Sequence, residues 1–293
     1  MSILVATDLS DNSRQAVRWA SALAALRNVP LLVVHVIETI GDDELWTALF
    51  ETPEEIEERV LRRGTEKVRD FVGDTLAGVT EPDRTKLLVA VGAVPEEIDR
   101  FATHFGADLV VSGTTGHGFI RNALFGSTAR RLVHSTSRPT AFIPPDAALP
   151  PAKRIVVGID FSPCSDAALR WTATHAAQWG SKVIAVHGLG VSALSPDYEP
   201  SANFVPMVDA IVEQREADVR RHLDAVEIEG DIIIERAGPA ESIIEAARDR
   251  RADLLVLGTH GRGALGRLVL GSVASRVLRH PPCATIVVHQ DKA

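Results

Sequence analysis

A long glycine-rich stretch occurs twice in the chain, and this repeat constrains the fold more than any other feature. Residues 108–129, DLVVSGTTGHGFIRNALFGSTA, return 145 positions later (from 108 to 253) as residues 253–274, DLLVLGTHGRGALGRLVLGSVA, without a gap. Each copy begins with a short apolar run that is typical of a buried strand. A glycine-rich loop follows, and then a Gly-Ser pair that suits the start of a helix. The repeat therefore predicts two domains of the same fold.

The glycines keep one spacing in both copies, which predicts a phosphate-binding loop. The pattern is Gly113-x2-Gly116-x9-Gly126-Ser127 in the first copy and Gly258-x2-Gly261-x9-Gly271-Ser272 in the second. Glycine at a strand end permits positive φ and lets backbone N–H groups approach a ligand closely. The helix N-terminus after the loop favours an anion through its free N–H groups and its dipole. The alternative is a structural loop with glycines in tight turns, because duplication copies either kind of loop.

The length of 293 residues suits two domains, and a hydrophobic content of 45% allows each of them to bury a core. We expect a first domain at residues 1–146, a linker at 147–153 within a proline-rich segment, and a second domain at 154–293. The net charge of −8 argues against a nucleic-acid partner, which would usually require a basic face. Two cysteines are too few for a disulfide framework or a metal cluster. With no signal peptide and no apolar run of transmembrane length, we expect a cytoplasmic protein without a membrane partner.

Apolar runs alternate with helical segments in both halves, which predicts parallel sheets covered by helices on both faces. We expect strands at residues 2–6, 30–37, 85–91, 108–113 and 139–143, and in the second half from residue 155 and at 182–187, 231–235, 253–258 and 283–289. A loop is expected at residues 191–206, before a long helix. Right-handed crossovers would make each sheet doubly wound, and ligands of such sheets bind beyond the carboxyl ends of the strands. If the first and fourth strands are neighbours, a strand-end aspartate and the glycine loop line one crevice in each half.

The chain resembles a tandem universal stress protein over essentially its whole length. The resemblance is carried by the strand-end acids in VATDLS and VGIDFS, the VHV of the second strand and both glycine motifs. It implies two Rossmann-like domains of the adenine nucleotide alpha hydrolase-like type, each with a five-stranded parallel sheet of order 3-2-1-4-5. It also implies a stress-response role and binding of ATP, with Mg²⁺ as a candidate companion ion. The family's dimerisation through the last strand implies an intramolecular pseudo-dimer of residues 139–143 and 283–289, and a homodimer of two chains is a further expectation.

The resemblance also assigns ligand-binding residues to both halves. In the first half they are Ala6, Thr7 and Asp8 near the adenosine, Val36 against the base, and Gly113, Gly116, His117, Gly126, Ser127 and Thr128 on the phosphate and ribose side. In the second half they are Gly158, Ile159, Asp160, Gly258, Gly261, Arg262, Gly271, Ser272 and Val273.

The second half departs from the family pattern at the adenosine side. Gly188 replaces Val36, which removes an apolar contact with the base, and Ile159 replaces Thr7, which loses a hydroxyl group. We therefore expect the first site to be the better adenine site. Arg262 stands where the first half has His117, and its fixed charge near the phosphates would offset part of this loss.

Several single residues have two interpretations. Asp8 and Asp160 are expected to contact the ligand, and the alternative is a cap on the following helix, for which Ser10 or Ser13 is also suitable in the first half. We expect His35 and His187 to be hydrogen-bonded core groups. Cys164 is expected to be a small residue at a helix start rather than a redox sensor. Three arginines follow the Gly-Ser pairs and lie either on solvated helix faces or near phosphates: Arg130, Arg131 and Arg276.

These observations predict a nucleotide-binding regulatory protein with no assigned catalytic residue and no metal site of its own. Neither loop resembles GxxxxGK[ST], so no loop lysine would hold the β- and γ-phosphates, and any ATP hydrolysis should be slow. The main alternative is a nucleotide-dependent enzyme of a related α/β family, of the ATPase or adenylyl transferase type. Such enzymes usually carry a glycine pair after the first strand, which this chain lacks. A flavoprotein-like redox module and a structural protein with relic loops are further alternatives.

Overall fold

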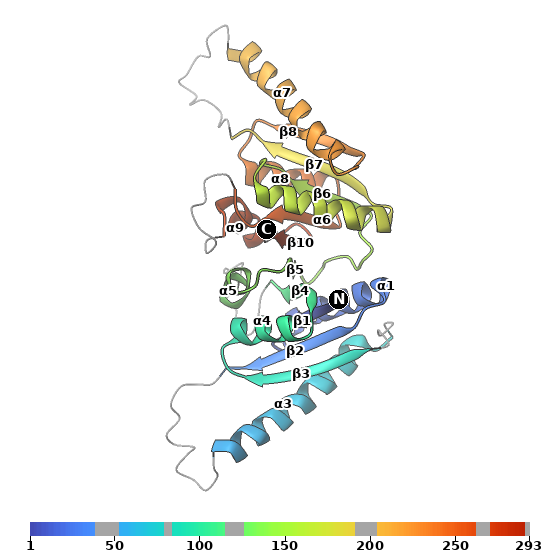
Figure 1. The fold of residues 1–293 in the computed structure, drawn as a ribbon, viewed down its shortest axis with the longest axis vertical. Coiled ribbons are helices and arrows are strands. Elements are labelled where there is room, and N and C mark those ends of the chain that lie inside the picture. The colour runs from blue at the N-terminus through green and yellow to red at the C-terminus, as the bar shows by residue number, and fades with distance from the viewer. Residues whose placement is uncertain (39–52, 79–83, 115–125, 191–203, 262–269, 291–293) are drawn as a thin grey trace. The chain divides into compact units, whose positions relative to one another are not determined.

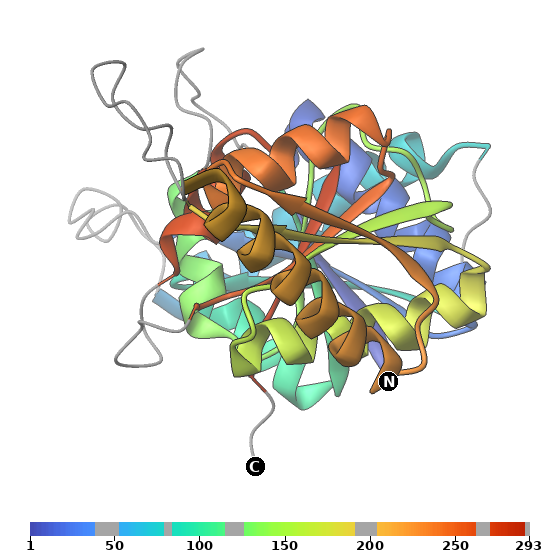
Figure 2. The same ribbon diagram turned by 90° about the horizontal axis from the view of Figure 1, so that it is seen from above.

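The computed structural model describes residues 1–38, 53–78, 84–114, 126–190, 204–261 and 270–290. The chain forms two compact units, Met1–Pro150 and Pro151–Ala293. Each unit has a central sheet with helices on both of its faces, as Figures 1 and 2 show. Two domains of one α/β fold, as the sequence repeat predicts, are therefore present.

Strands and helices alternate through the first unit. Its described elements are β1 (Ser2–Ala6), α1 (Asp11–Arg27), β2 (Leu31–Ile37), α3 (Pro53–Leu76), β3 (Thr85–Val91), α4 (Val94–His104), β4 (Ala107–Gly113), α5 (Ser127–Ser135) and β5 (Thr140–Ile143). The strands pair in parallel in the order β3-β2-β1-β4-β5, which confirms the predicted order. The carboxyl ends of β1 and β4 are neighbours, with Ala6 opposite Ser112.

The second unit repeats this order. Its described elements are β6 (Arg154–Gly158), α6 (Pro163–Trp179), β7 (Lys182–Gly188), α7 (Phe204–Asp224), β8 (Gly230–Glu235), α8 (Pro239–Asp249), β9 (Leu254–Gly258), α9 (Ser272–Arg279) and β10 (Ala284–Val288). Parallel pairing gives the order β8-β7-β6-β9-β10. The predicted loop at 191–206 was wrong at its end, because α7 begins at Phe204. Pro206 lies in the first turn, where a helix needs no N–H donor.

The strands are apolar on both sides because helices cover both faces of each sheet. In the first unit, α1 and α3 contact each other, and α4 packs beside α5. Leu4, Leu32 and Val110 of the sheet pack against Ile98 of α4 and Leu132 of α5. Since the strands are mostly apolar, the polar groups that could bind a ligand are expected mainly at the strand ends and loops.

No described helix is both long and apolar enough to span a membrane. Among the described residues, no His, Cys, Asp and Glu side chains gather into a group that could hold a metal ion. Both cysteines are buried free thiols. Cys164 lies in the first turn of α6, and its Sγ accepts a hydrogen bond from the Thr259 hydroxyl (3.7 Å), so the structure gives it a packing role at a helix start.

The thiol of Cys283 should make stability depend on alkaline pH. Burial, with a smaller contribution from the charge of Asp253, raises the pKa of this thiol from 9.0 to about 12. The unfolded chain releases the proton near pH 9 while the folded chain retains it, so the stabilisation is complete below pH 9 and declines as the pH rises toward 12. Between pH 9 and 10 the loss should be about 1 kcal/mol.

The measurement is the free energy of unfolding in urea for the wild type and Cys283→Ala at pH 8, 9 and 10. Subtracting the two curves removes the other groups that titrate in this range. The wild type should lose its advantage over the variant as the pH rises. Parallel curves would show that the thiol ionises equally in both states.

Candidate functional site

A hollow with a volume of about 170 Å³ lies at the carboxyl ends of the strands in the second unit. Its walls come from the ends of β6, β7 and β9, from the residues that follow β6 and β9, and from the first turns of α6, α8 and α9. The lining residues are Gly158, Ile159, Asp160, Ser165, Gly188, Pro239, Ile243, Leu257, Gly258, Thr259, His260, Gly261, Gly271, Ser272, Val273 and Ala274. Every predicted binding residue of this half that the structure describes lines this one hollow. Arg262 lies outside the described residues.

The first turn of α9 faces the hollow without a side-chain cap. Gly271 is the N-cap residue and makes no side-chain hydrogen bond to the helix, and Ser272, Val273 and Ala274 line the hollow. The first intrahelical bond runs from Ser275 N to Gly271 O (2.9 Å). The N–H groups of the first turn have no partner within the helix, and with the helix dipole they make this end suitable for an anion.

In the second unit the motif glycines serve close approach rather than positive φ, which corrects one sequence expectation. Gly126 and Gly271 have φ values of −63° and −58°, and the left-handed glycines of the described chain lie elsewhere. A Cβ atom on Gly258 would lie 2.7 Å from the carbonyl carbon of Cys164. A Cβ on Gly261 would lie 2.7 Å from Asp160 Oδ2. Strand β9 and its loop therefore press directly against the start of α6 and against Asp160.

Asp160 forms a tight turn at the end of β6. Its Oδ1 accepts a hydrogen bond from the backbone N–H of Ser162 (3.0 Å), while Oδ2 faces Gly261 inside the hollow. Phe161 between them has φ 61°, an uncommon conformation for a bulky residue. Leu9 has φ 63° at the matching place in the first unit. Ser162, and not Asp160, is the N-cap residue of α6. The interpretation of Asp160 as the helix cap is therefore wrong, and its carboxylate stabilises the turn before the helix instead.

Gly188 and Gly158 let α8 approach the sheet closely. This packing explains why a glycine stands at position 188, which the sequence alone did not explain. A Cβ on Gly188 would lie 2.6 Å from Pro239 Cα, and a Cβ on Gly158 would lie 2.8 Å from Ile243 Cδ1. The space that Val36 fills in the first unit is therefore filled here by the first turn of α8. Pro239 and Ile243 supply apolar lining that no motif predicted. The sequence did contain one sign of this close packing, because Gly158 and Gly188 stand where the first half has the larger residues Ala6 and Val36.

The first unit brings its predicted residues to the same end of its sheet. Ala6, Thr7 and Asp8 end β1, and Gly113 ends the neighbouring β4. Val36 lies near the end of β2 and packs with Ala6 on the core cluster under α4. Gly126 N donates to Thr114 O (3.1 Å) beyond the end of β4. Helix α5 begins with no side-chain cap, and Ser127 and Thr128 lie in its first turn. Gly116 and His117 lie outside the described residues.

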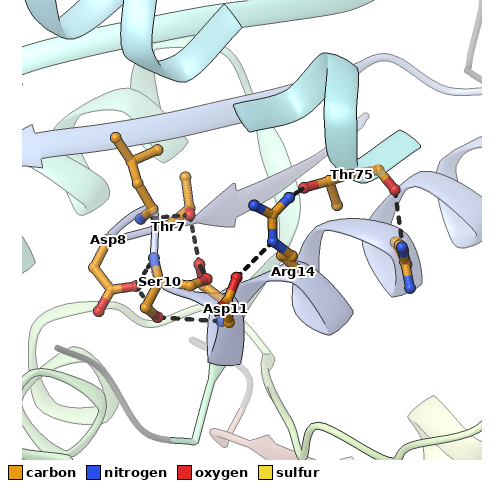
Figure 3. A network of polar contacts seen from close by, with 9 residues as sticks. Thr7, Asp8, Ser10, Asp11, Arg14 and Thr75 are labelled. Atoms are coloured by element: carbon orange, nitrogen blue, oxygen red, sulfur yellow. Dashed lines mark hydrogen bonds and ion pairs between the residues drawn. The ribbon is translucent and has the colours of Figure 1, made fainter. Parts of the chain in front are cut away.

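A polar network joins the end of β1 to α1 and α3 (Figure 3). The Thr7 hydroxyl lies 2.8 Å from the Ser13 hydroxyl and accepts a bond from Leu9 N (3.0 Å). Arg14 binds Asp11 (2.9 Å) and, at 2.9 Å, the hydroxyl of the fully buried Thr75 in α3. Thr7 is itself 6% exposed. Its hydroxyl therefore serves the internal structure, and its replacement by Ile159 in the second unit removes an internal contact.

The histidines and arginines for which the sequence allowed two interpretations have structural roles. Nδ1 of His35 is hydrogen-bonded to Thr7 O (2.9 Å) and Nδ1 of His187 to Ile159 O (2.7 Å), which confirms the prediction of hydrogen-bonded histidines, although both rings are half-buried. Arg130 and Arg131 lie exposed on α5. Arg276 of α9 forms an ion pair with Glu241 of α8, which joins the two helices whose first turns line the hollow.

Comparison with known proteins gives one consistent family. The model of the universal stress protein family matches the chain twice, over residues 1–144 and 151–289. A universal stress protein of Mycolicibacterium smegmatis is 30% identical over 298 residues, which cover 98% of this chain and 96% of the relative. Universal stress protein Rv2005c of Mycobacterium tuberculosis is 29% identical over 309 residues, 98% of this chain and 97% of its own.

A solved structure shares the fold across both units. The crystal structure of a universal stress protein from Archaeoglobus fulgidus superposes with a TM-score of 0.64 at 20% sequence identity. The superposition covers 99% of this chain and 98% of the other. The tandem arrangement is therefore found in relatives of the same length.

Proposed function

The chain belongs to the universal stress protein family, with two family domains in tandem, and on this basis we propose that it is an ATP-binding regulatory protein of the stress response. Each unit would hold its nucleotide at the carboxyl ends of its strands. The observation that carries the proposal is the first turn of α9, which faces a hollow without a side-chain cap and shares that hollow with Asp160. A helix N-terminus of this kind suits a phosphate group.

The strand ends supply backbone groups for the base. Thr7 N donates to Val34 O (2.9 Å), so the peptide groups of Val34 face β1. Peptide groups alternate in direction along a strand, so those of Val36 face the same way, into the space beyond the end of β1. In the second unit the bond from Ile159 N to Val186 O (2.9 Å) places the peptide groups of Gly188 likewise. A donor and an acceptor side by side suit the edge of an adenine, with or without a valine side chain.

The described residues of the second hollow fit part of such a nucleotide. Apolar contacts would come from Ile159, Pro239, Ile243 and Leu257. The volume of about 170 Å³ is below the roughly 300–1,000 Å³ of a typical complete ligand cleft, so the outer phosphates would lie at its mouth. Asp160 would face the ribose or a Mg²⁺ ion carried by the phosphates, because a bare carboxylate repels phosphate oxygens.

A regulatory role fits the side chains better than a catalytic one. No lysine is present among the described residues that line the second hollow, and neither glycine loop contains the lysine of a GxxxxGK[ST] motif. Such a lysine holds the β- and γ-phosphates in many nucleotide hydrolases. We therefore expect bound ATP to be hydrolysed slowly, so that occupancy itself is the signal.

Equilibrium binding of ATP to the full chain tests the proposal. We expect one ATP per unit, measured by calorimetry with and without Mg²⁺, and adenine nucleotide released from protein purified without added ligand. Turnover of bound ATP, followed over hours, should be slow. Rapid multiple turnover would favour the enzyme alternative. Failure to bind any adenine nucleotide, with or without Mg²⁺, would refute the proposal. Pairing of the two units through residues 139–143 and 283–289, and a homodimer of the chain, stay predictions for sedimentation and cross-linking experiments.

A further inference from the structure

Two hydrogen bonds join the start of α6 to the residues that follow β9 in the second unit, and one of them, from the Thr259 hydroxyl to Cys164 Sγ, is long (3.7 Å). The Ser162 hydroxyl donates to the backbone carbonyl of His260 (3.1 Å), two residues beyond the end of β9. We propose that Ser162 is a positioning residue of the second nucleotide site, and that this bond holds the beginning of the glycine loop in its binding geometry. The inference rests on the proposed function and goes beyond it by assigning a role to a residue outside the glycine motif.

The turn after β6 aims the hydroxyl at the loop. Asp160 Oδ1 accepts from Ser162 N (3.0 Å), and Phe161 with φ 61° reverses the chain between them. Ser162 is 2% exposed, so water does not compete for its proton. The same hydroxyl accepts from Ser165 N (3.2 Å) as the cap of α6. The Ser162 hydroxyl therefore accepts a hydrogen bond as the cap of α6 and donates its proton to the carbonyl of His260.

The loop is held from its other side by the start of α9. Gly271 N donates to Thr259 O (2.8 Å), and Nδ1 of His260 lies 2.9 Å from the Thr259 hydroxyl. Asp160 Oδ2 lies against Gly261, where a Cβ would be only 2.7 Å away. Ser162 and Cys164 thus hold residues 259–260 against α6, while the carbonyl of Thr259 is bonded to the start of α9. Without the bond from Ser162, His260 and Gly261 could move away from the Asp160 carboxylate and from the first turn of α9, which would hold the phosphate.

The first unit has the same serine but uses its proton differently. The Ser10 hydroxyl accepts from Ser13 N (3.3 Å) as the cap of α1, and it donates to Asp8 Oδ1 (2.6 Å), as Figure 3 shows. A serine hydroxyl has one proton, so Ser10 orients the aspartate while Ser162 holds the carbonyl of His260. Ser10 is therefore a matched control for Ser162. It caps its helix in the same way, but it donates its proton to Asp8 instead of to a backbone carbonyl after the fourth strand.

The test compares Ser162→Gly with Ser162→Thr, both in a Gly126→Val background that removes the first site. Glycine is nearly as good a helix cap as serine, whereas threonine retains the hydroxyl. We expect Ser162→Gly to weaken ATP binding at the second site about tenfold, which corresponds to one buried hydrogen bond. Ser162→Thr should bind ATP within about twofold of its parent. Ser10→Gly in an otherwise wild-type chain should lower stability as Ser162→Gly does, without faster exchange of the Gly271 amide.

A second readout needs no nucleotide. Hydrogen exchange of the Gly271 amide, whose acceptor is Thr259 O, should accelerate about tenfold in ligand-free Ser162→Gly, because the carbonyl moves with the loop. Unchanged exchange would overturn the inference even if ATP binds. Unchanged ATP affinity in Ser162→Gly, with a parent that binds ATP, would overturn the positioning role alone. A parent that binds no ATP would refute the proposed function, and the binding role with it, while faster exchange would still establish the structural bond.

Discussion

Gly188→Ala should lower the free energy of unfolding of the second unit by about 3 kcal/mol or more, while Gly158→Ala should lower it by only about 1 kcal/mol. Both substitutions add one methyl group, and both would place it 2.6 Å from the nearest atom. At Gly188 that atom is Pro239 Cα, with Pro239 N at 3.0 Å, so the backbone of α8 would have to move. At Gly158 the nearest atoms are the ends of two side chains, Cδ2 of Leu257 and, at 2.8 Å, Cδ1 of Ile243, which can shift at a lower cost than backbone.

The measurement is urea denaturation of both variants, with hydrogen exchange of β6 to β9 assigning the transition to the second unit. Both glycines lie at the ends of neighbouring strands, and both variants add the same methyl group. A difference in stability between the two variants therefore reports which atoms the methyl group contacts. Equal losses in the two variants would contradict the argument, and would mean that α8 moves as easily as a leucine side chain. A large loss at Gly188 alone would show that this glycine is required by packing in the ligand-free protein.

Most of the fold was predictable because its signals are local and repeated. Apolar runs covered on both faces predicted the parallel strands, and the repeat fixed two copies of one strand order. Strand bounds such as Thr85–Val91 were predicted to the residue. The start of α7 was not, since Pro206 suggested a loop where it lies in the first helical turn.

The site was predictable where it follows the glycine motif and unpredictable where it depends on packing between elements. The spacing of Gly258, Gly261 and Gly271 predicted where the hollow lies, but the expectation that these glycines adopt positive φ was wrong. Their φ values are ordinary where they bear on the site, and what matters is the missing Cβ. Pro239 and Ile243 line the hollow from a helix without any motif, and only three-dimensional packing brings them there.

Side-chain hydrogen bonds near the site were the least predictable feature. The segments DLSDNS and DFSPCS align without a gap, with aspartate and both serines in register. Even so, the hydroxyl of Ser10 donates to Asp8, whereas the hydroxyl of Ser162 donates to His260 O. A hydroxyl proton takes whichever acceptor the surrounding fold presents, and residue type alone does not determine that choice. Thr7 gives the same lesson, because its hydroxyl binds Ser13 within the network.

Gly271→Val and Gly126→Val should each remove one ATP site, with affinity at the altered site falling by at least about 100-fold. The backbone gives valine no difficulty, since φ and ψ are −58° and 153° at Gly271 and −63° and 147° at Gly126. Any residue adopts such extended angles. The effect would come from the side chain, which would stand in front of the free N–H groups of the first helical turn and occupy the place proposed for phosphate.

The two variants should differ in stability although they agree in binding. A Cβ on Gly126 would lie 3.6 Å from Thr114 O, an ordinary contact, whereas a Cβ on Gly271 would lie 3.1 Å from Thr259 O and 3.4 Å from His260 Cα. We therefore expect Gly126→Val to unfold at close to the wild-type urea concentration and Gly271→Val to cost about 1 kcal/mol. Gly73→Ala, on the exposed side of α3 with nothing within 4 Å, is the control that should leave ATP binding unchanged. Calorimetry on each single variant and on the double variant should give one, one and no ATP per chain. Two ATP per chain in either single variant would show that phosphate binds elsewhere, and the uncapped helix starts would then be structural.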